Sequence, residues 1–341
     1  MRFLCFGVGA IGTYIGGSLM LSGRDVVFLD RPETAAEVRR NGLKLVLPHD
    51  ERRLATPTIV ESIEAALEQG PYDFALVAVK SYDTPALLDM LRPYRADLPA
   101  MICLQNGVEN ENRLRSLVGF PNVIPATVTS AVGRLGPGQI VLERLRGVGL
   151  AYTPRVFGLL MAFDQAGLKP QIYADADAMK WSKLLTNLPA NATSAILNWT
   201  PAQVFSHPGI FRLEVAQFRE ALAVMSAWPL RVYDLPGTPV RALAWTIRHL
   251  PPFLSRLLLK QALTKGRGDK LPSFHIDLYS GRKHSEVDYL NGAVARQAAA
   301  FKLPAPVNKG LTRILSALAA GSLPLTTYAD QPEKLIADIF A

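Results

Sequence analysis

The chain has 341 residues, of which 49% are hydrophobic and 19% charged, and its formal net charge is +8. This length suffices for two domains of ordinary size, and this composition excludes a disordered chain. Lysines and arginines are spread along the chain without a nucleic-acid-binding motif, so we expect an anionic cofactor and an anionic small-molecule substrate rather than nucleic acid.

The two cysteines, Cys5 and Cys103, lie in predicted buried strands, which is typical of core residues in a reducing compartment. No cluster of cysteine and histidine in the sequence predicts a metal site.

The first apolar run, to about Leu21, resembles a secretion signal, but its regularly spaced glycines and the absence of a clear cleavage site favour a folded domain. No later stretch reaches the roughly 18 apolar residues of a membrane span. We therefore expect a cytoplasmic protein.

The chain begins with an apolar strand, residues 2–6, which runs directly into G-x-G-x-x-G at 7–12 and then into an apolar helix. In a doubly wound fold, Gly7 allows the tight turn, Gly9 lets the backbone approach a pyrophosphate, and Gly12 lets the helix pack against the strand. The helix N-terminus offers N–H groups and a positive dipole to phosphates. The pattern therefore predicts dinucleotide binding by the following residues: Gly7, Val8, Gly9, Ala10, Ile11 and Gly12.

The second strand, residues 25–29, ends at Asp30 and Arg31. An acidic side chain here binds a ribose 2′-OH and favours NAD, whereas an arginine pairs with the 2′-phosphate of NADP. We favour NADP, because Arg31 can pair with the phosphate while Asp30 turns away. Asp30 keeps NAD open as the less favoured alternative.

The α/β pattern continues to about residue 174. Helices are expected over 34–41, 62–67 and 84–91. Strands are expected over 43–46, 55–60, 73–79, 100–104, 123–126, 140–142 and 148–151, of which 148–151 is expected to be the last. Turns are expected at Gly133 and at 136–138. Lys80 and Asn106 lie at the carboxyl ends of two of the buried strands. Ligands of such sheets lie beyond the carboxyl ends of the strands, so both side chains are expected to meet cofactor or substrate.

From about Asp175, helical periodicity replaces strand-length runs. Helices are expected over 176–187, 210–227, 240–263, 285–301 and 308–320. We therefore predict a Rossmann-type α/β domain with a parallel sheet over 1–174 and an all-helical domain over 175–341. Within the latter, 240–265 is basic and amphipathic, which favours a core-packing helix over a membrane-surface helix. The apolar helical domain is compatible with a homodimer or a monomer.

Two stretches of the helical part are more distinctive than the glycine motif. They are K-W-S-K-L-L-T-N-L-P-A-N at 180–191 and S-E-V-D-Y-L-N-G at 285–292. Together with the glycine turn, the strand end Val79-Lys80 and Gln105-Asn106-Gly107, they make the chain resemble the ketopantoate reductases from end to end. The resemblance implies NADPH-dependent reduction of 2-dehydropantoate to (R)-pantoate, on the route to pantothenate and coenzyme A. Another 2-oxo acid is the nearest alternative, and a non-catalytic dinucleotide sensor is the rival from another class.

The resemblance also implies roles for individual residues. Lys183 matches the catalytic lysine and Glu286 the catalytic-site glutamate. The remaining matches are the cofactor glycines, Arg31 at the 2′-phosphate, Lys80 and Asn106 along the cofactor and substrate, and Asn187, Asn191 and Ser273 at the substrate. Elementary chemistry agrees, because reducing a ketone by hydride requires a proton donor where negative charge develops on oxygen. Lys183 and Asn187 are four residues apart and share one helix face.

Three departures from the family pattern concern specificity. Lys270 falls where a substrate-binding asparagine is usual, and the segment 229–268 is longer and richer in arginine and proline. Both bear on the substrate, whereas Asp30 bears on the cofactor. The long segment is compatible with a lid, a dimer surface or a membrane contact.

Overall fold

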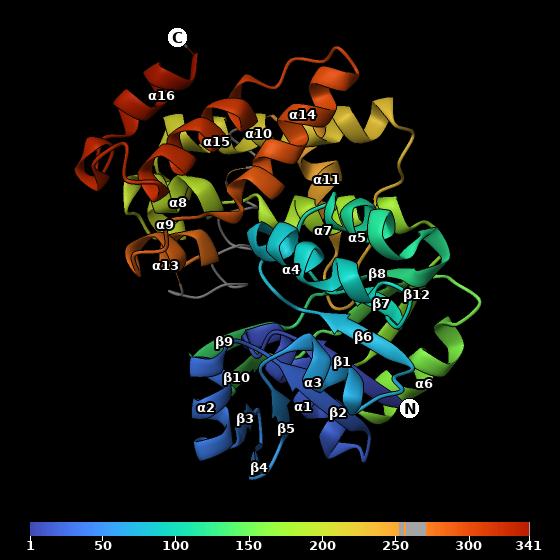
Figure 1. Cartoon of the computed structure of the whole chain (residues 1–341). Coiled ribbons are helices and arrows are strands. Elements are labelled where there is room, and N and C mark those ends of the chain that lie inside the picture. Colours follow the sequence, from blue (N-terminus) through green and yellow to red (C-terminus); the bar gives the residue numbers. More distant parts are fainter. Residues whose placement is uncertain (252–255, 257–270, 341) are drawn as a thin grey trace. The chain divides into compact units, whose positions relative to one another are not determined.

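The computed structural model describes residues 1–251, 256 and 271–340, and the chain divides into two compact units (Figure 1). The first unit comprises Met1–Lys180 with Leu235–Thr238, and the second comprises Trp181–Asp234 with Pro239–Ala341. The division falls after Lys180 rather than after residue 174, and the buried Lys180 side chain contacts Glu111 and the Gln105 carbonyl group, which both belong to the first unit. The helix α7 (Ala176–Asn187) therefore begins in one unit and ends in the other.

The first unit is built on an eight-stranded sheet in the order β12-β11-β8-β7-β6-β1-β2-β5. The strands are β1 (Arg2–Phe6), β2 (Asp25–Leu29), β5 (Thr58–Val60), β6 (Phe74–Val77), β7 (Ala100–Cys103), β8 (Val123–Val128), β11 (Val148–Ala151) and β12 (Pro170–Tyr173). Neighbours from β5 to β8 are parallel, and only the β8–β11 pairing is antiparallel. Because β1 lies between β2 and β6, the strand order reverses there, and ligands of doubly wound sheets bind at such a point.

Side chains of β1 alternate between two apolar layers, which explains why this sheet is buried on both faces. Phe3 and Cys5 join the layer covered by α1 (Ala10–Leu21) and α6 (Val156–Gln165). Leu4 and Phe6 join the layer covered by α3 (Ile63–Glu68), α4 (Thr84–Leu91) and α5 (Asn110–Val118). A continuous apolar strand covered by helices on both sides is typical of parallel sheets, and it confirms the predicted fold class.

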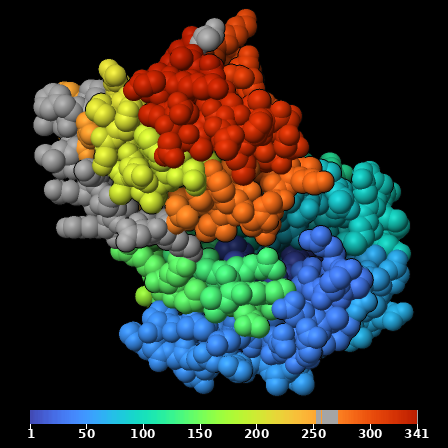
Figure 2. Space-filling view, turned by 90° about the vertical axis from the view of Figure 1, so that its left-hand side faces the viewer, coloured from blue at the N-terminus to red at the C-terminus, as the bar shows by residue number. Residues whose placement is uncertain are grey.

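A second sheet of four strands, in the order β4-β3-β10-β9, packs against α1. Its strands are β3 (Leu43–Leu47), β4 (Asp50–Leu54), β9 (Ala131–Gly136) and β10 (Gln139–Arg144). Figure 2 shows the blue and green segments of this unit side by side, as the parallel pairing of β3 with β10 requires. The predicted turn at Gly133 is wrong, because Gly133 lies inside β9, where a Cβ would meet the side chains of Val141 and Glu143.

The described part of the second unit is helical. Its helices are α8 (Asn191–Leu197), α9 (Pro201–Ser206), α10 (Pro208–Ala227), α11 (Val240–His249), α13 (Ser273–Tyr279), α14 (Asn291–Ala300), α15 (Pro306–Ala319) and α16 (Pro332–Phe340), with short 3-10 turns η4 (Glu286–Tyr289) and η5 (Leu325–Thr327). The long helix α10 contacts α9, α11, α14, α15 and α16, so the core of this unit forms around it.

Three expected elements differ from the structure. The helix expected over 285–301 is interrupted at Leu290 (φ −113°, ψ −82°), where η4 gives way to α14. The helix expected over 240–263 ends at His249, because Leu250 is extended before Pro251. Residues 252–255 and 257–263 of the expected helix, and Lys270, lie outside the described residues. The strand 148–151 is not the last one, since the short β12 follows it at the edge of the sheet.

Candidate functional site

The glycine turn is shaped for a bound phosphate. Gly7 has φ +96°, and a Cβ at Gly12 would lie 1.9 Å from the Gly7 carbonyl oxygen, so only glycine fits at position 12. A Cβ at Gly9 would meet no heavy atom within 4 Å, which leaves open space beside the turn. Helix α1 begins after Gly9 without a side-chain cap. Its first N–H groups are therefore available to an anion, and the turn fits a dinucleotide pyrophosphate.

The acidic and basic residues after β2 are engaged differently. The Asp30 carboxylate accepts hydrogen bonds from the backbone N–H groups of Val8 (2.6 Å) and Arg31 (2.8 Å). It thereby ties the end of β2 to the glycine turn. Arg31 directly precedes α2 (Pro32–Asn41), and Arg31 is exposed. Asp30 therefore holds the backbone of the glycine turn, and Arg31 is accessible to an anion.

Side-chain amides hold together the two loops that follow β6 and β7. Gln105 Nε2 donates to the carbonyl oxygens of Val79 (3.1 Å) and Lys80 (3.4 Å). Asn110 Nδ2 donates to the carbonyl oxygen of Asn106 at 2.7 Å. Lys80 is partly buried and Asn106 is exposed. The structure thus brings these two predicted site residues onto neighbouring, mutually braced strand ends.

In the second unit, Lys183 and Asn187 lie partly buried on α7, and Asn187 is its last residue. Asn191 is buried at the start of α8, and its Oδ1 accepts a hydrogen bond from the Phe274 N–H at 3.1 Å. This bond fastens α8 to the start of α13, where Ser273 is exposed. The structure therefore brings Asn191 and Ser273 together.

Glu286 is buried at the first position of η4, with 3% of its surface exposed. The preceding serine caps this turn by accepting a hydrogen bond from the Val287 N–H at 3.2 Å. Helix α15 packs against both η4 and α8, so the elements that carry Glu286 and Asn191 share one neighbour.

One buried carboxylate of this unit was not identified from the sequence. Glu214 of α10 accepts hydrogen bonds from Ala190 N–H (2.8 Å), Thr193 Oγ1 (2.6 Å) and Gln217 Nε2 (2.7 Å). Ala190 has φ +54° and joins α7 to α8, so Glu214 holds the turn between two predicted substrate asparagines. In the sequence, the segment that contains Glu214 has the amphipathic pattern of a surface helix. The one sequence signal for a special role of Glu214 is that an acidic residue stands at a position facing the core.

Further amides continue this polar interior. Asn291 Nδ2 donates to Gln217 Oε1 and Asn308 Oδ1, both at 2.9 Å. Glu220 accepts hydrogen bonds from the N–H groups of Val307 and Asn308, each at 2.9 Å, at the start of α15. Burial raises the pKa of Glu220. These contacts give the unit a single arrangement of α10, α14 and α15, because each buried polar group has a specific partner.

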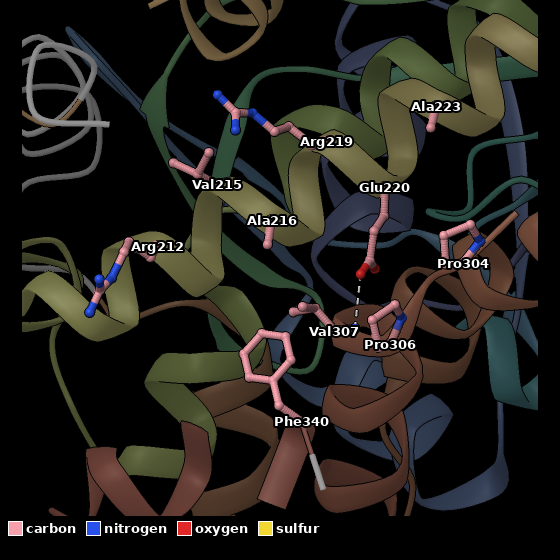
Figure 3. Close-up of a pocket in the computed structure, with 10 residues that line it drawn as sticks. All are labelled: Arg212, Val215, Ala216, Arg219, Glu220, Ala223, Pro304, Pro306, Val307 and Phe340. Atoms are coloured by element: carbon pink, nitrogen blue, oxygen red, sulfur yellow. Dashed lines mark hydrogen bonds between the residues drawn. The ribbon is translucent and has the colours of Figure 1, made fainter. Parts of the chain in front are cut away.

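A surface pocket of about 500 Å³ lies elsewhere in the same unit, between α10, the start of α15 and Phe340. Figure 3 shows Glu220 directed towards Val307 beside Pro306, with Arg212 and Arg219 on the same helix as Glu220. None of the predicted site residues lines it. The Glu220 carboxylate, which lines the pocket, already accepts hydrogen bonds from the N–H groups at the start of α15. We therefore do not include this pocket in the candidate site.

Two general features of the described residues bear on function. Over residues 1–251, 256 and 271–340, no group of three or more histidine, cysteine, aspartate or glutamate side chains is placed to hold a metal ion. Within the same residues, no helix is both long and apolar enough to cross a membrane.

The sheet order, the glycine turn and the helical second unit are typical of dinucleotide-binding proteins of the Rossmann type that carry a helical second part. The family model "Ketopantoate reductase PanE/ApbA" matches residues 3–153, and "Ketopantoate reductase PanE/ApbA C terminal" matches 175–319. The chain therefore belongs to the ketopantoate reductase family, which confirms the predicted resemblance.

Relatives and solved structures agree with this assignment. The 2-dehydropantoate 2-reductase of Halobacterium salinarum is 25% identical over 324 residues, covering 92% of this chain and 98% of the relative. That of Pyrobaculum aerophilum is 29% identical over 247 residues, covering 72% and 76%. The structure of a PanE/ApbA family ketopantoate reductase from Ralstonia eutropha JMP134 is similar with a TM-score of 0.79 and 25% identity, covering 94% and 99%. A D-mandelate dehydrogenase with NADH and anilino(oxo)acetate is similar in fold, with a TM-score of 0.77, 19% identity and coverage of 94% and 99%.

Proposed function

We propose that this protein is an NADPH-dependent reductase of a 2-oxo acid, and that its substrate is 2-dehydropantoate, which it reduces to (R)-pantoate. One observation carries the proposal. This chain, a member of the family, combines a glycine turn followed by a helix N-terminus without a side-chain cap with the polar residues Lys183, Asn187 and Glu286. A protein that only senses a dinucleotide would need the turn but not the three polar residues. The named 2-dehydropantoate 2-reductases among the relatives support the substrate.

The first unit holds the cofactor in this proposal. The N–H groups after Gly9 bind the pyrophosphate, Arg31 pairs with the 2′-phosphate, and Lys80 and Asn106 lie along the nucleotide. When bound, the nicotinamide supplies a hydride. The Asp30 carboxylate keeps the turn in place through Val8 and does not select the ribose.

The second unit supplies the proton and the substrate contacts. The Lys183 ammonium donates a proton to the ketone oxygen, where negative charge develops, and its own charge stabilises that oxygen beforehand. Glu286 orients this lysine or accepts a substrate hydroxyl. Asn187, Asn191 and Ser273 position the substrate. A cytoplasmic location and a homodimer stay predictions.

A panel of 2-oxo acids assayed with both NADPH and NADH tests the reaction and its specificity together. We expect the highest kcat/KM with 2-dehydropantoate and NADPH, followed by loss of the nicotinamide absorbance. Preference for another 2-oxo acid would replace the substrate and keep the reaction class. Cofactor binding without reduction of any member of the panel would identify a sensor and refute the enzyme.

Replacing Lys183 tests the proton donor. Lys183→Ala should lower kcat by about 10²-fold or more, since that is the usual contribution of a positioned general acid. Lys309→Ala is the matched control, because Lys309 is an exposed lysine on α15 of the same unit. Near-normal turnover in Lys183→Ala would remove this lysine from the proposed role.

Replacing Arg31 tests the cofactor preference. Arg31→Ala should lower the ratio of NADPH to NADH affinity by about 10-fold or more, because a charge-assisted phosphate contact is lost. Arg40→Ala, at an exposed arginine in the last turn of α2, is the control. An unchanged ratio would refute the 2′-phosphate role.

A further inference from the structure

The first unit contains a fully buried ammonium group that the proposed reaction does not use. Lys180 is 4% exposed, and its Nζ lies 2.7 Å from Glu111 Oε1, 2.7 Å from the Gln105 carbonyl oxygen and 3.2 Å from the Ala126 carbonyl oxygen. The ammonium group donates hydrogen bonds to the two carbonyl oxygens and forms an ion pair with the carboxylate. Glu111 is itself buried on α5, with 5% of its surface exposed.

This lysine is held in its charged form. Burial lowers the pKa of Lys180, but the Glu111 carboxylate and the neighbouring Cys103 raise it, and the net direction is upward. Lys180 therefore stays charged at neutral pH.

Stability alone does not account for such a pair. Two charges taken out of water lose hydration, and well-packed apolar residues in their place are often equally or more stabilising. The ammonium adds a directional contact, because it holds the carbonyl group of Gln105, in the loop after β7, to the carbonyl group of Ala126 inside β8.

The Gln105 carbonyl is the link to the candidate site. Asn106 follows directly, and its own carbonyl is braced by Asn110, which lies on the same helix as Glu111. The Gln105 side chain at the same time holds the backbone of Val79 and Lys80. A shift of Gln105 would therefore move Lys80 and Asn106 together.

We propose that Lys180, paired with Glu111, is a positioning residue that sets the Gln105–Asn106 strand end for cofactor binding. The inference rests on the proposed function in one respect, namely that Asn106 contacts the bound nicotinamide nucleotide. It assigns a role to the first lysine of the K-W-S-K pattern that differs from the role of the second.

A double-mutant cycle between Lys180→Met and Asn106→Ala tests this, with the dissociation constant of the cofactor as readout. The cycle is measured by fluorescence titration on the full chain, with whichever of NADPH and NADH the wild type binds more tightly. Each single variant should weaken binding by about 10-fold, and the double variant by little more than either, because residues acting through one another are not additive. Effects that multiply to within twofold would overturn the proposal, and so would an unchanged dissociation constant in either single variant.

Two further variants separate positioning from a loss of stability. Leu114→Ala opens a cavity on α5, where Leu114 is buried, and its effect on binding should be independent of Asn106→Ala. Lys180→Met/Glu111→Leu removes both charges and should recover unfolding stability, while the Gln105 carbonyl still lacks its donor and binding stays weak. If this double variant binds cofactor like the wild type, the pair is only structural. The same double variant replaces Lys180→Met in the cycle with Asn106→Ala if Lys180→Met alone does not fold.

These readouts are independent of turnover. A wild-type protein that binds cofactor but reduces no 2-oxo acid refutes the proposed reaction and leaves the positioning role to be decided by the cycle. Conversely, an active enzyme with multiplicative effects refutes the positioning role alone.

Discussion

The glycine turn of the first unit and the α7–α8 turn of the second both contain a residue with positive φ, but they reach it by different means. Gly7 has φ +96° and carries no side chain, so its conformation costs little. Ala190 has φ +54° and is an L-residue, for which this region costs about 1–2 kcal/mol. The first turn is specified by missing side chains, and the second is held by the distant Glu214 carboxylate through the Ala190 N–H.

The difference teaches where each unit is vulnerable. In the glycine turn, any added atom is harmful, because the backbone must approach both itself and a ligand closely. In the α7–α8 turn, any lost partner is harmful, because buried polar groups without hydrogen bonds are costly. Substitutions can separate the two cases.

The largest effect is expected at Gly12. Gly12→Ala places a Cβ 1.9 Å from the Gly7 carbonyl oxygen, so the backbone must move. We expect a loss of about 3 kcal/mol or more in the free energy of unfolding, as for severe overpacking. The measurement is denaturant unfolding, together with cofactor titration, which should show no binding at micromolar cofactor.

Gly9→Ala is the control for that substitution. Its Cβ would meet no protein atom, so unfolding should change by less than about 1 kcal/mol while cofactor affinity falls by about 10-fold. If Gly9→Ala binds cofactor normally, the open space beside the turn is not where the pyrophosphate lies.

Removing the carboxylate of Glu214 should come next in size. Glu214→Ala leaves three buried donors without an acceptor, and we expect unfolding to be easier by about 3 kcal/mol. Glu333→Ala, at an exposed glutamate of α16, should change the free energy of unfolding by less than about 0.5 kcal/mol. Equal effects of the two substitutions would show that the α7–α8 turn does not depend on the Glu214 carboxylate.

A smaller effect should distinguish Ala190 from an ordinary helical alanine. Ala190→Gly relieves the positive-φ strain but loses a buried methyl group, so the two terms of about 1 kcal/mol each should nearly cancel. Ala195→Gly, buried within α8, loses the methyl and helix propensity together and should cost about 2 kcal/mol. Equal losses at both positions would mean that Ala190 carries no strain.

The smallest effect is a pH dependence in the second unit. Burial lowers the pKa of His275, whose Nε2 lies 2.8 Å from Asn198 Oδ1, below the ordinary histidine value of about 6.5. The unfolded chain therefore binds more protons than the folded one, and His275 contributes stability that is present above about pH 6.5 and lost as pH falls through the folded pKa. Thermal unfolding from pH 7.5 to 5 should show this slope, and His275→Gln should flatten it. A slope unchanged in His275→Gln would assign the pH dependence to other groups.

Local pattern was sufficient for much of the fold. The glycine spacing at 7–12, the buried strands before Lys80 and Asn106, and the helical periodicity after Asp175 depend on neighbours within a few residues. The same holds for the motifs around Lys183 and Glu286, which carried much of the family resemblance. Periodicity failed at Leu290 and Leu250, where one residue leaves the helical region, and at the short edge strand β12.

Sequence patterns were enough to predict the fold class, the family resemblance and the residues proposed for the chemistry. Three contacts are visible only in the folded chain: Asp30 binds the backbone of the glycine turn, Glu214 holds Ala190, and Lys180 meets Glu111 and the Gln105 carbonyl. The physical reason is that a polar side chain becomes specific only when burial removes water as an alternative partner, and its remaining partners come from segments distant in the sequence.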